Sequence, residues 1–371
     1  DCKLIPVGFL WEDKMKKVCI MLGSLNGVGG TGRAVSILAN HLCNKYSVKI
    51  LCYDQDVENI GYEVDKRISI DSVFNKPTRM TYGIFKMIPY MARYLKQNDI
   101  ETVIVCGTLN FVGGIIAARI AGAKVICCDH SNYTCVYDAK FERESRNFAA
   151  KFSNYLVTLT EKDIDNYKKG TKVKAKILAI PNIIDDELVH GSKDIQYDIA
   201  SHRIVSVGRL TYAKNYELMI EIAKKVLDSN PSWSWDIYGT GELEEALLRK
   251  KDEINVPRLF FRGNVTNMYD LYADYSFLVM TSRYEGFPMV LIEAMARKLP
   301  CIAFDCQTGP SDIIFDGING FVIPEDKESM ISTIQSMIDN DSKRKQFSDN
   351  TKYTLEKFST EATMKKWEMI I

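Results

Sequence analysis

The chain has 371 residues, of which 46% are hydrophobic and 26% are charged, with 48 basic and 48 acidic side chains. This composition excludes disordered and fibrous proteins, and the length exceeds what one ordinary hydrophobic core accommodates, so two domains are expected. No stretch approaches the roughly 18 to 20 apolar residues of a membrane-spanning helix. Residues 1–190 carry 26 basic and 21 acidic side chains, a modest excess that indicates an anionic ligand or surface, without any nucleic-acid recognition motif.

Residues 1–14 mix charged and apolar side chains and lack the uninterrupted apolar core of a secretion signal. Met15 begins a sequence that leads into a strand pattern, so we expect residues 1–14 to be an added extension or tag. The ten cysteines form no Cys-x-x-Cys pair and lie mostly in apolar runs, which is typical of buried free thiols in a reducing cytoplasm. The four histidines form no cluster with them, and no metal site is expected.

From residue 16 on, apolar strand patterns alternate with amphipathic helix patterns. In the first set, strands are expected at residues 18–22, 48–53, 102–106, 124–128, 155–160 and 177–180, with a first helix at about 31–45. A polar stretch at 185–201 is typical of a linker. In the second set, strands are expected at residues 204–207, 235–238, 259–261, 277–280, 301–304 and 321–323. The alternation predicts an α/β protein with two doubly wound parallel sheets, in domains placed at residues 1–186 and 187–352.

A glycine-rich segment, residues 26–33, follows the first predicted strand. Gly27, Gly29 and Gly32 have the G-x-G-x-x-G spacing of a dinucleotide-binding loop, and Asp54 supplies an acidic residue about twenty positions later. Two features argue against a nicotinamide or flavin site. Four residues separate the strand from Gly27, whereas the fingerprint normally begins at the strand's end, and such a site leaves the second domain without a role.

Residues 76–96 combine five cations with several Met, Ile and Tyr side chains. Such a segment either lies on an anionic membrane or forms a helix that packs its apolar face on the sheet. The sequence leaves both interpretations open.

Polar residues also follow two predicted strands at the position where doubly wound sheets bind ligands. His130 ends the segment that follows the strand at 124–128, and a lone histidine there is either structural or directed at a ligand. Arg209 and Lys214 share the loop after the strand at 204–207. They form either a solvated basic loop or a pair of cations suited to neutralise a diphosphate.

Two carboxylates bracket the start of another predicted helix. Glu285 lies on the loop after the strand at 277–280, Pro288 suits the first helical turn, and Glu293 lies just over a turn into the helix. Ionised carboxylates only accept hydrogen bonds, so this pair suits the hydroxyls of a ribose and a hexose, and the helix N-terminus suits a phosphate. The alternative is one glutamate at a helix start and another on the surface of an amphipathic helix.

The Glu-x7-Glu spacing, with Gly286, Phe287 and Pro288 inside it, resembles the signature of the retaining glycosyltransferases of family 4, which have the GT-B fold. The resemblance extends over residues 16–371. It implies two Rossmann-like domains that face each other across a cleft, with the acceptor on the N-terminal side and the donor on the C-terminal side. It further implies that a C-terminal helix within residues 353–371 packs back on the first domain.

The same resemblance implies roles for individual residues. The catalytic set is expected to comprise His130 beside the donor hexose, Glu285 on its hydroxyls, and Arg209 and Lys214 on the departing diphosphate. The donor-binding set is expected to comprise Gly29, Gly30, Thr31, Arg209, Lys214, Asn264, Val265, Glu285, Gly286, Phe287, Pro288, Met289 and, on the ribose, Glu293. Many family members have an acidic residue where Gly32 stands, so contacts from that side chain do not transfer. No metal and no cofactor are expected, because the nucleotide sugar is a substrate.

The function implied is a retaining, metal-independent hexosyltransferase that uses a nucleotide-sugar donor, expected to be a uridine-diphosphate sugar. Its acceptor is a glycan or polyprenyl-linked glycan in the synthesis of bacterial capsule, exopolysaccharide or another surface glycoconjugate. The implied location is the cytoplasm, with peripheral contact to the anionic inner face of the plasma membrane. The alternatives are a nonhydrolysing sugar-nucleotide epimerase, a phosphorylase, and an inactive regulatory binding module of the same fold. The four charges at positions 209, 214, 285 and 293 favour the transferase.

Overall fold

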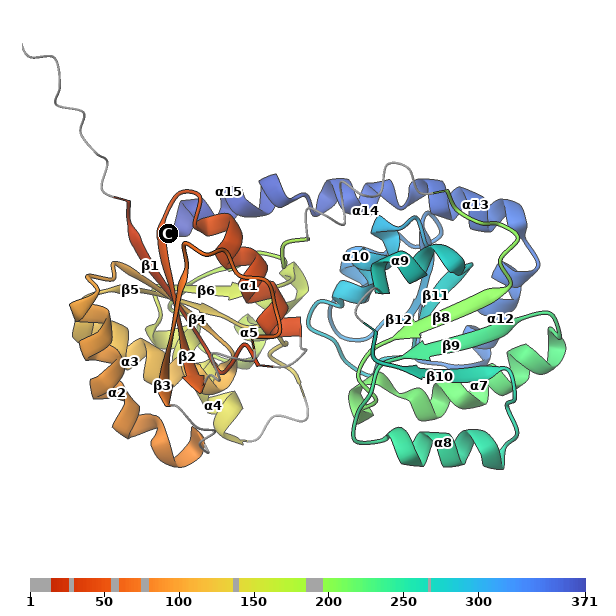
Figure 1. Cartoon of the computed structure of the whole chain (residues 1–371), viewed down its shortest axis with the longest axis horizontal. Helices are drawn as coiled ribbons and strands as arrows, with labels where there is room; N and C mark the ends of the chain where they lie inside the picture. The colour runs from red at the N-terminus through yellow and green to blue at the C-terminus, as the bar shows by residue number, and fades with distance from the viewer. Residues whose placement is uncertain are drawn as a thin grey trace, which may run out of the picture.

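The computed structural model describes residues 15–26, 30–54, 60–74, 80–135, 140–184, 196–265 and 268–371. It contains two parallel sheets with helices on both faces, one sheet in each half of the chain (Figure 1). The α/β architecture with two doubly wound domains is therefore confirmed. The expected extension at 1–14 and the boundary between residues 186 and 187 lie outside the described residues, so both stay predictions.

The first sheet has seven strands in the order β3-β2-β1-β4-β5-β6-β7. The strands are β1 (Lys17–Leu22), β2 (Ser47–Asp54), β3 (Ser69–Phe74), β4 (Thr102–Cys106), β5 (Lys124–Cys128), β6 (Tyr155–Thr158) and β7 (Lys176–Ala179). The helices are α1 (Gly30–Leu42), α2 (Met80–Gln97), α3 (Phe111–Ala121), α4 (Lys140–Phe152) and α5 (Glu161–Gly170). Because every pair of neighbouring strands is parallel, all carboxyl ends lie at one edge of the sheet. That edge carries the segments that begin α1 and follow β5.

Strand β3 is absent from the strands predicted above. It lies at the edge of the sheet, and all six of its residues are only half-buried. The predictions relied on continuous apolar runs, which are typical of central strands covered on both faces. The mixed sequence of Ser69–Phe74 is that of an edge strand and does not give this signal.

The second sheet has six strands in the order β10-β9-β8-β11-β12-β13. The strands are β8 (Arg203–Val207), β9 (Ser234–Tyr238), β10 (Leu259–Gly263), β11 (Phe277–Met280), β12 (Cys301–Phe304) and β13 (Gly320–Ile323). The helices are α7 (Tyr216–Ser229), α8 (Glu244–Glu253), α9 (Met268–Leu271), α10 (Met289–Ala296), α11 (Pro310–Ile313), α12 (Lys327–Ile338), α13 (Asp341–Asn350), α14 (Lys352–Lys357) and α15 (Thr360–Ile370). All strand pairs are again parallel, so the loops after β8 and β11 meet at one edge.

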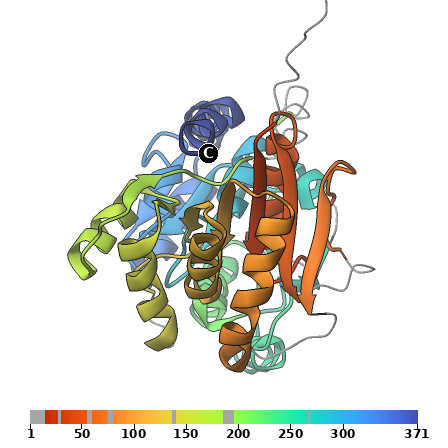
Figure 2. The same ribbon diagram turned by 90° about the vertical axis from the view of Figure 1, so that its left-hand side faces the viewer.

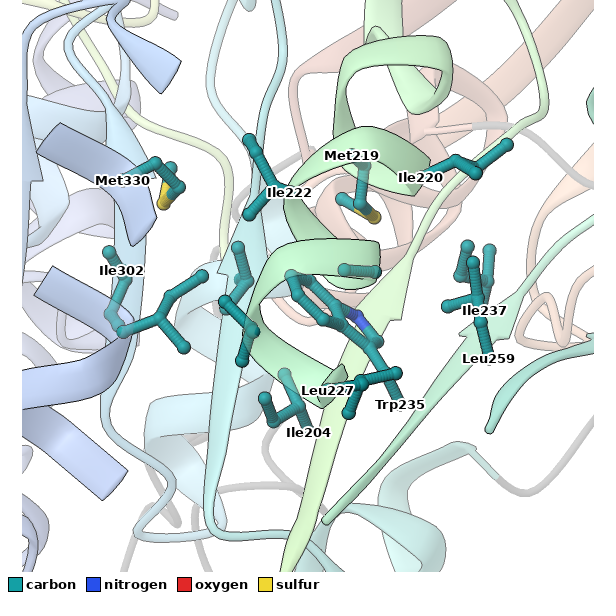
Figure 3. Close-up of a cluster of buried hydrophobic side chains, with 14 of the residues drawn as sticks. Ile204, Met219, Ile220, Ile222, Leu227, Trp235, Ile237, Leu259, Ile302 and Met330 are labelled. Atoms are coloured by element: carbon teal, nitrogen blue, oxygen red, sulfur yellow. The ribbon is translucent and has the colours of Figure 1, made fainter. Parts of the chain in front are cut away.

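One layer of the second domain's core lies between its sheet and helices α7 and α12, and another lies between the sheet and α10. Figure 3 shows Trp235 of β9 among aliphatic side chains of this cluster, which include Ile222 and Leu227 of α7. The indole N–H of Trp235 donates to Ser206 Oγ at 3.0 Å, so its one polar atom is satisfied although the side chain is fully buried. A rigid core of this kind fixes the strand ends that carry the polar loops.

The last helix, α15, leaves the second domain and packs on the first. It continues from α14 across the top of both domains in Figure 1. Trp367, Ile370 and Ile371 are buried in the core cluster that also contains side chains of β1 and α1. The C-terminal segment thus ties the two domains together through apolar packing.

Helix α2 uses its apolar face in the core of the first domain. Met87, Met91 and Leu95 are buried there, whereas Tyr90 is exposed. Residues 75–79 lie outside the described residues, and the side chains of 80–86 are not described either. The described part favours the second interpretation of residues 76–96, that of a helix packed on the sheet. None of the described helices is both long and apolar enough to cross a membrane.

The nine cysteines from Cys19 to Cys306 that fall in the described residues are buried and free. Burial raises the pKa of the Cys19 and Cys301 thiols well above the ordinary value. These thiols therefore remain protonated at neutral pH, as expected of core residues that pack as small apolar groups.

We expect Trp367→Ala to destabilise the protein by about 3 to 5 kcal/mol, because it removes a large side chain that is 3% exposed in the first-domain core. Met369→Ala is the control, since Met369 lies on the same helix and is 72% exposed. The measurement is the free energy of unfolding in urea. Equal losses for the two variants would show that α15 does not tie the domains together through Trp367.

Candidate active site

Glu285 lies on the loop between β11 and α10 and is held by contacts to its side chain. Its Oε1 accepts hydrogen bonds from Lys214 Nζ at 2.5 Å and from Ser282 Oγ at 2.6 Å. The Glu285 side chain is 11% exposed and that of Lys214 is 21% exposed. A largely buried carboxylate needs such a partner, because an unpaired buried charge is costly. Two residues predicted to act together are thus in direct contact.

The same loop meets the first domain through its backbone. Asn132 Nδ2 donates to the Glu285 carbonyl at 2.9 Å, and Thr308 Oγ1 donates to it at 2.5 Å. A Cβ atom on Gly286 would lie 2.6 Å from the carbonyl oxygen of His130 and 2.9 Å from that of Ser131. Only glycine permits this approach, so the Gly286 position brings the loop after β5 against the loop after β11.

Lys214 and Arg209 occupy the loop after β8, but the structure places them differently. Lys214 ends the short 3₁₀ helix Tyr212–Lys214, and its carbonyl accepts from Thr281 Oγ1 at 3.1 Å. Arg209 is exposed, and its guanidinium forms no ion pair within the part of the chain that the structure describes. The predicted pair of cations is therefore one anchored lysine and one solvent-facing arginine.

The Gly-Thr-Gly turn at residues 239–241 supports this loop. Gly239 has a φ of 135°, and a Cβ atom there would lie 2.0 Å from the carbonyl oxygen of Gly208. Leu210 N donates to the Thr240 carbonyl at 3.0 Å. The turn thus packs backbone to backbone on the segment that carries Arg209, which gives these glycines an architectural role.

Glu293 pairs with a residue of the first domain. Its Oε1 lies 2.7 Å from Nη1 of Arg33 on α1, and the Glu293 side chain is only 6% exposed. The Arg33 guanidinium also lies 4.8 Å from the ring centre of Tyr269. Arg33 is not among the residues predicted from the sequence. One feature of the sequence could have indicated it: Arg33 lies near the N-terminus of a helix that has no acidic residue in its first turn. The helix dipole disfavours positive charge at that position.

His130 follows β5 and is in contact with the Gly286 turn through its carbonyl. Both ring nitrogens are buried and make no well-formed hydrogen bond in the described part of the chain, although Cys128 and Asn182 lie near the ring and help to raise its pKa. Burial alone lowers the pKa of His130, but the neighbouring Cys128 and Asp129 outweigh it, so the pKa is raised. Buried polar atoms without a partner are rare in folded proteins and indicate a group that meets a ligand or water.

A buried network fixes the loop that carries His130. Asp129 Oδ2 lies 2.7 Å from Arg146 Nε of α4, with both side chains 1% exposed, and accepts from Tyr167 Oη of α5 at 2.7 Å. Asp129 Oδ1 accepts from the N–H of Ser131 at 3.0 Å. Burial by itself raises the pKa of Asp129, but these charged and polar partners outweigh it and lower the pKa. No sequence pattern pointed to Arg146 or Tyr167, because nothing in one sequence pairs them with Asp129.

Asp163 on α5 completes this network. Its Oδ1 accepts from the N–H of Tyr133 at 2.9 Å, while its Oδ2 is buried without a partner among the described residues. Burial and the nearby charge of Asp129 raise the pKa of Asp163 to about 7. The network therefore contains one carboxylate that stays ionised and one that titrates near neutrality.

The remaining predicted residues are placed as follows. Phe287 is buried and its ring lies 5.2 Å from that of Phe358, so its side chain belongs to the core. Pro288 is the N-cap of α10, one residue before the predicted helical position, and Met289 begins the helix and is half-buried.

The side chains of Asn264 and Val265 are exposed beyond β10, and Asn264 Nδ2 donates to Thr240 Oγ1 at 3.0 Å. Gly30 and Thr31 form the first turn of α1, while Gly29, like Gly27, lies outside the described residues.

A polar groove of about 570 Å³ runs beside α1, a volume in the usual range of ligand pockets. Its lining comprises Arg33, Ser36, Ile37, Asn40, His41, Asn44, Gly61, Tyr62, Glu63, Asp65 and Arg67. The Tyr62 ring would lie 2.7 Å from a Cβ atom on Gly32, so an aromatic ring occupies the place of a side chain at position 32. Arg33 therefore connects this groove to Glu293 of the second domain.

The described residues contain no group of three or more His, Cys, Asp or Glu side chains placed to hold a metal ion. The chemistry available among them consists of two cation-paired carboxylates, a histidine with unpaired nitrogens and an exposed arginine.

Comparison with known proteins identifies the family. The model of Glycosyltransferase Family 4 matches residues 28–188, and the model of Glycosyl transferases group 1 matches residues 198–354. The poly(ribitol-phosphate) alpha-N-acetylglucosaminyltransferase of Staphylococcus aureus (strain COL) is 32% identical over 369 residues, which cover 86% of this chain and 73% of that protein. The chain belongs to the family 4 glycosyltransferases. The resemblance inferred from Glu285 and Glu293 is thus confirmed at the level of the family.

Further relatives of this glycosyltransferase agree. The amylovoran biosynthesis glycosyltransferase AmsD of Erwinia amylovora is 29% identical over 365 residues, which cover 96% of this chain and all of that protein. The crystal structure of a mutant of S. aureus TarM with Fondaparinux, alpha-GlcNAc-glycerol and UDP has a TM-score of 0.82 at 18% identity, covering 96% and 99% of the two chains. This structural likeness confirms the GT-B fold.

The pKa of Asp163 predicts a pH-dependent stability. An unfolded chain releases this proton near the ordinary pKa of 3.8, whereas the folded protein releases it near 7. Between these values the unfolded state binds fewer protons, so the free energy of unfolding falls as pH rises from about 4 to 7, by up to about 4 kcal/mol. Asp163→Asn removes this dependence. The free energy of unfolding of the variant, relative to that of the wild type, should therefore rise as pH increases from 5 to 8.

Urea unfolding at both pH values is the measurement. Asp165→Asn, on the exposed side of the same helix, is the control and leaves the wild-type pH dependence in place. A stability difference between Asp163→Asn and the wild type that is the same at pH 5 and pH 8 would contradict the assignment.

Proposed function

We propose that this glycosyltransferase moves a hexosyl group from a uridine-diphosphate sugar to a glycan or polyprenyl-linked glycan acceptor, with retention of anomeric configuration and without a divalent metal. The process would be the synthesis of a bacterial surface polysaccharide or glycoconjugate. One observation carries the proposal: the turn at Glu285 and Gly286, with Lys214 bonded to Glu285, lies in contact with the loop of His130 from the other domain. The contact assembles groups suited to a diphosphate and a sugar at one place.

The names of the relatives support the finer parts of this proposal. The S. aureus relative is named as a poly(ribitol-phosphate) alpha-N-acetylglucosaminyltransferase, and the TarM complex contains UDP together with alpha-GlcNAc-glycerol. The common uridine-diphosphate hexoses carry an alpha linkage to phosphate, so an alpha product corresponds to retention. AmsD is named for the biosynthesis of amylovoran.

In the proposed reaction the bond between the sugar C1 and the diphosphate oxygen breaks, and the acceptor hydroxyl oxygen bonds to C1 on the same face. The hydroxyl proton passes to the departing diphosphate, so no protein nucleophile is needed. Lys214, with Arg209 in solvent nearby, offsets the negative charge that develops on the diphosphate. Glu285 accepts from hexose hydroxyls, Glu293 accepts from the ribose, and the unpaired nitrogens of His130 face the reacting sugar. The polar groove beside α1 suits a hydroxyl-rich acceptor.

Lys214→Ala is expected to lower kcat by roughly 100- to 1000-fold, the usual cost of removing one group that stabilises developing charge. The measurement is UDP release with a lipid-acceptor extract, accompanied by the melting temperature to confirm folding. Lys224→Ala is the matched control, since Lys224 pairs with Asp228 on the surface of α7. A kcat for Lys214→Ala equal to that of the control would remove Lys214 from the proposed chemistry.

Glu293→Gln is expected to weaken donor binding by roughly 10- to 100-fold, because hydrogen bonds from ribose hydroxyls to a charged acceptor are replaced by bonds to a neutral amide. The measurement is the shift in melting temperature across a panel of nucleotide sugars, which rises with ligand concentration above the dissociation constant. Glu217→Gln on α7 serves as the control. Unchanged affinity of Glu293→Gln for the best donor would exclude the ribose role.

The two assays also separate the alternatives. A donor that shifts the melting temperature without UDP release from any acceptor extract would indicate an inactive binding module. Interconversion of free nucleotide sugars would indicate an epimerase. A product with inverted configuration, seen by NMR at the new anomeric carbon, would exclude retention.

A further inference from the structure

A second charged surface lies at the opposite edge of the first sheet from the candidate site. Three segments meet where β5, β6 and β7 begin. Arg119 Nη2 at the end of α3 donates to the carbonyl of Phe152 at the end of α4, at 2.7 Å. The N–H groups of Lys174 and Ala175 donate to the Ala150 carbonyl at 2.8 and 2.9 Å. These bonds place the ends of α3 and α4 beside the segment that connects α5 to β7.

This surface carries a large excess of positive charge. It comprises the exposed residues Arg119, Ile120, Lys151, Phe152, Lys168, Lys169, Lys172, Lys174 and Lys176, which we call the distal basic surface. Residues 119–124, 150–155 and 168–176 contain no Asp or Glu. Within the described residues none of its seven cations forms an ion pair, whereas Lys345 and Lys365 elsewhere pair with carboxylates four residues away. Carboxylates lie at its border: Asp165 is exposed one turn before Lys168 and Lys169 on α5, Asp99 pairs with Lys17, and Glu101 precedes β4.

Two large apolar side chains lie within these cations. Ile120 is 51% exposed and Phe152 is 37% exposed. The Arg119 guanidinium lies 5.4 Å from the centre of the Phe152 ring, so charge and apolar surface are in direct contact. A solvated lysine-rich face has no need of exposed Ile and Phe, whereas a bilayer interface takes both, with cations at the headgroups and apolar groups at the acyl boundary.

We propose that the distal basic surface docks this glycosyltransferase on an anionic lipid bilayer. Figure 2 views the first domain from the side away from the second domain. The proposal rests on the proposed function only in that a lipid-linked acceptor would lie in the same membrane. It differs from the interpretation of residues 76–96 as the membrane contact, since the described part of α2 turns its apolar face to the core.

The test is co-sedimentation of the full chain with phosphatidylglycerol/phosphatidylcholine vesicles and with pure phosphatidylcholine vesicles. The wild type is expected to bind only the anionic vesicles, and binding should weaken as salt rises. The combined variant Lys169→Gln, Lys172→Gln and Lys174→Gln is expected to lose affinity by about tenfold or more. The matched control carries Lys225→Gln, Lys345→Gln and Lys352→Gln, which remove the same charge from exposed positions of the second domain.

A second pair of substitutions distinguishes a bilayer from a soluble polyanion. Ile120→Ser with Phe152→Ser should weaken vesicle binding and leave binding to polyphosphate unchanged. The proposal fails if the wild type ignores anionic vesicles, if both triple variants bind alike, or if polyphosphate binds as tightly as the vesicles and the apolar substitutions change nothing. UDP release with a soluble acceptor should be the same in the wild type and in the triple variant of the distal basic surface. Absence of UDP release from the wild type would instead contradict the proposed function.

Discussion

The candidate site depends on one close approach of two backbones. The Gly286 turn lies against the carbonyls of His130 and Ser131, at a distance that leaves no space for a Cβ atom. Asn132 then reaches the Glu285 carbonyl, so the backbone of each loop fixes the other. Without this contact the histidine and the carboxylate, which belong to different domains, would have no defined geometry. The proposed catalysis therefore depends on the relative position of the two sheets.

Both carboxylates of the site are neutralised within the protein. Glu285 is paired with Lys214, and Glu293 is paired with Arg33 of the other domain. Pairing offsets the cost of holding these charges in a poorly solvated place. Under the proposed function, a donor would exchange these contacts for its own, so its affinity would be the difference between bonds gained and bonds given up. Because Arg33 and Glu293 lie on different domains, a donor that bound Glu293 as proposed would also change the contact between the domains.

The sequence predicted the architecture and the polar loops well, because parallel sheets place apolar runs and strand-end loops in a regular order. It could not predict the pairings. Lys214 was grouped with Arg209 because they share a loop, yet its partner is Glu285, 71 residues away. The edge strand β3 was not predicted, because its half-buried residues form no continuous apolar run. The network around Asp129 was not predicted either. Contacts between helices and strand ends depend on the folded arrangement, and residue spacing within one sequence does not reveal them.

The first sheet separates two surfaces with different chemistry. Its carboxyl edge carries the His130 loop, and its amino edge carries the distal basic surface. Strand β5 has five residues, so these edges lie at least about 13 Å apart at about 3.3 Å per residue. If the amino edge contacts the bilayer, the reacting sugar is held away from the membrane by this thickness. Such a geometry favours an acceptor whose free end extends several sugars from its lipid over one whose first sugar adjoins the headgroup, a preference that acceptors of graded length measure directly.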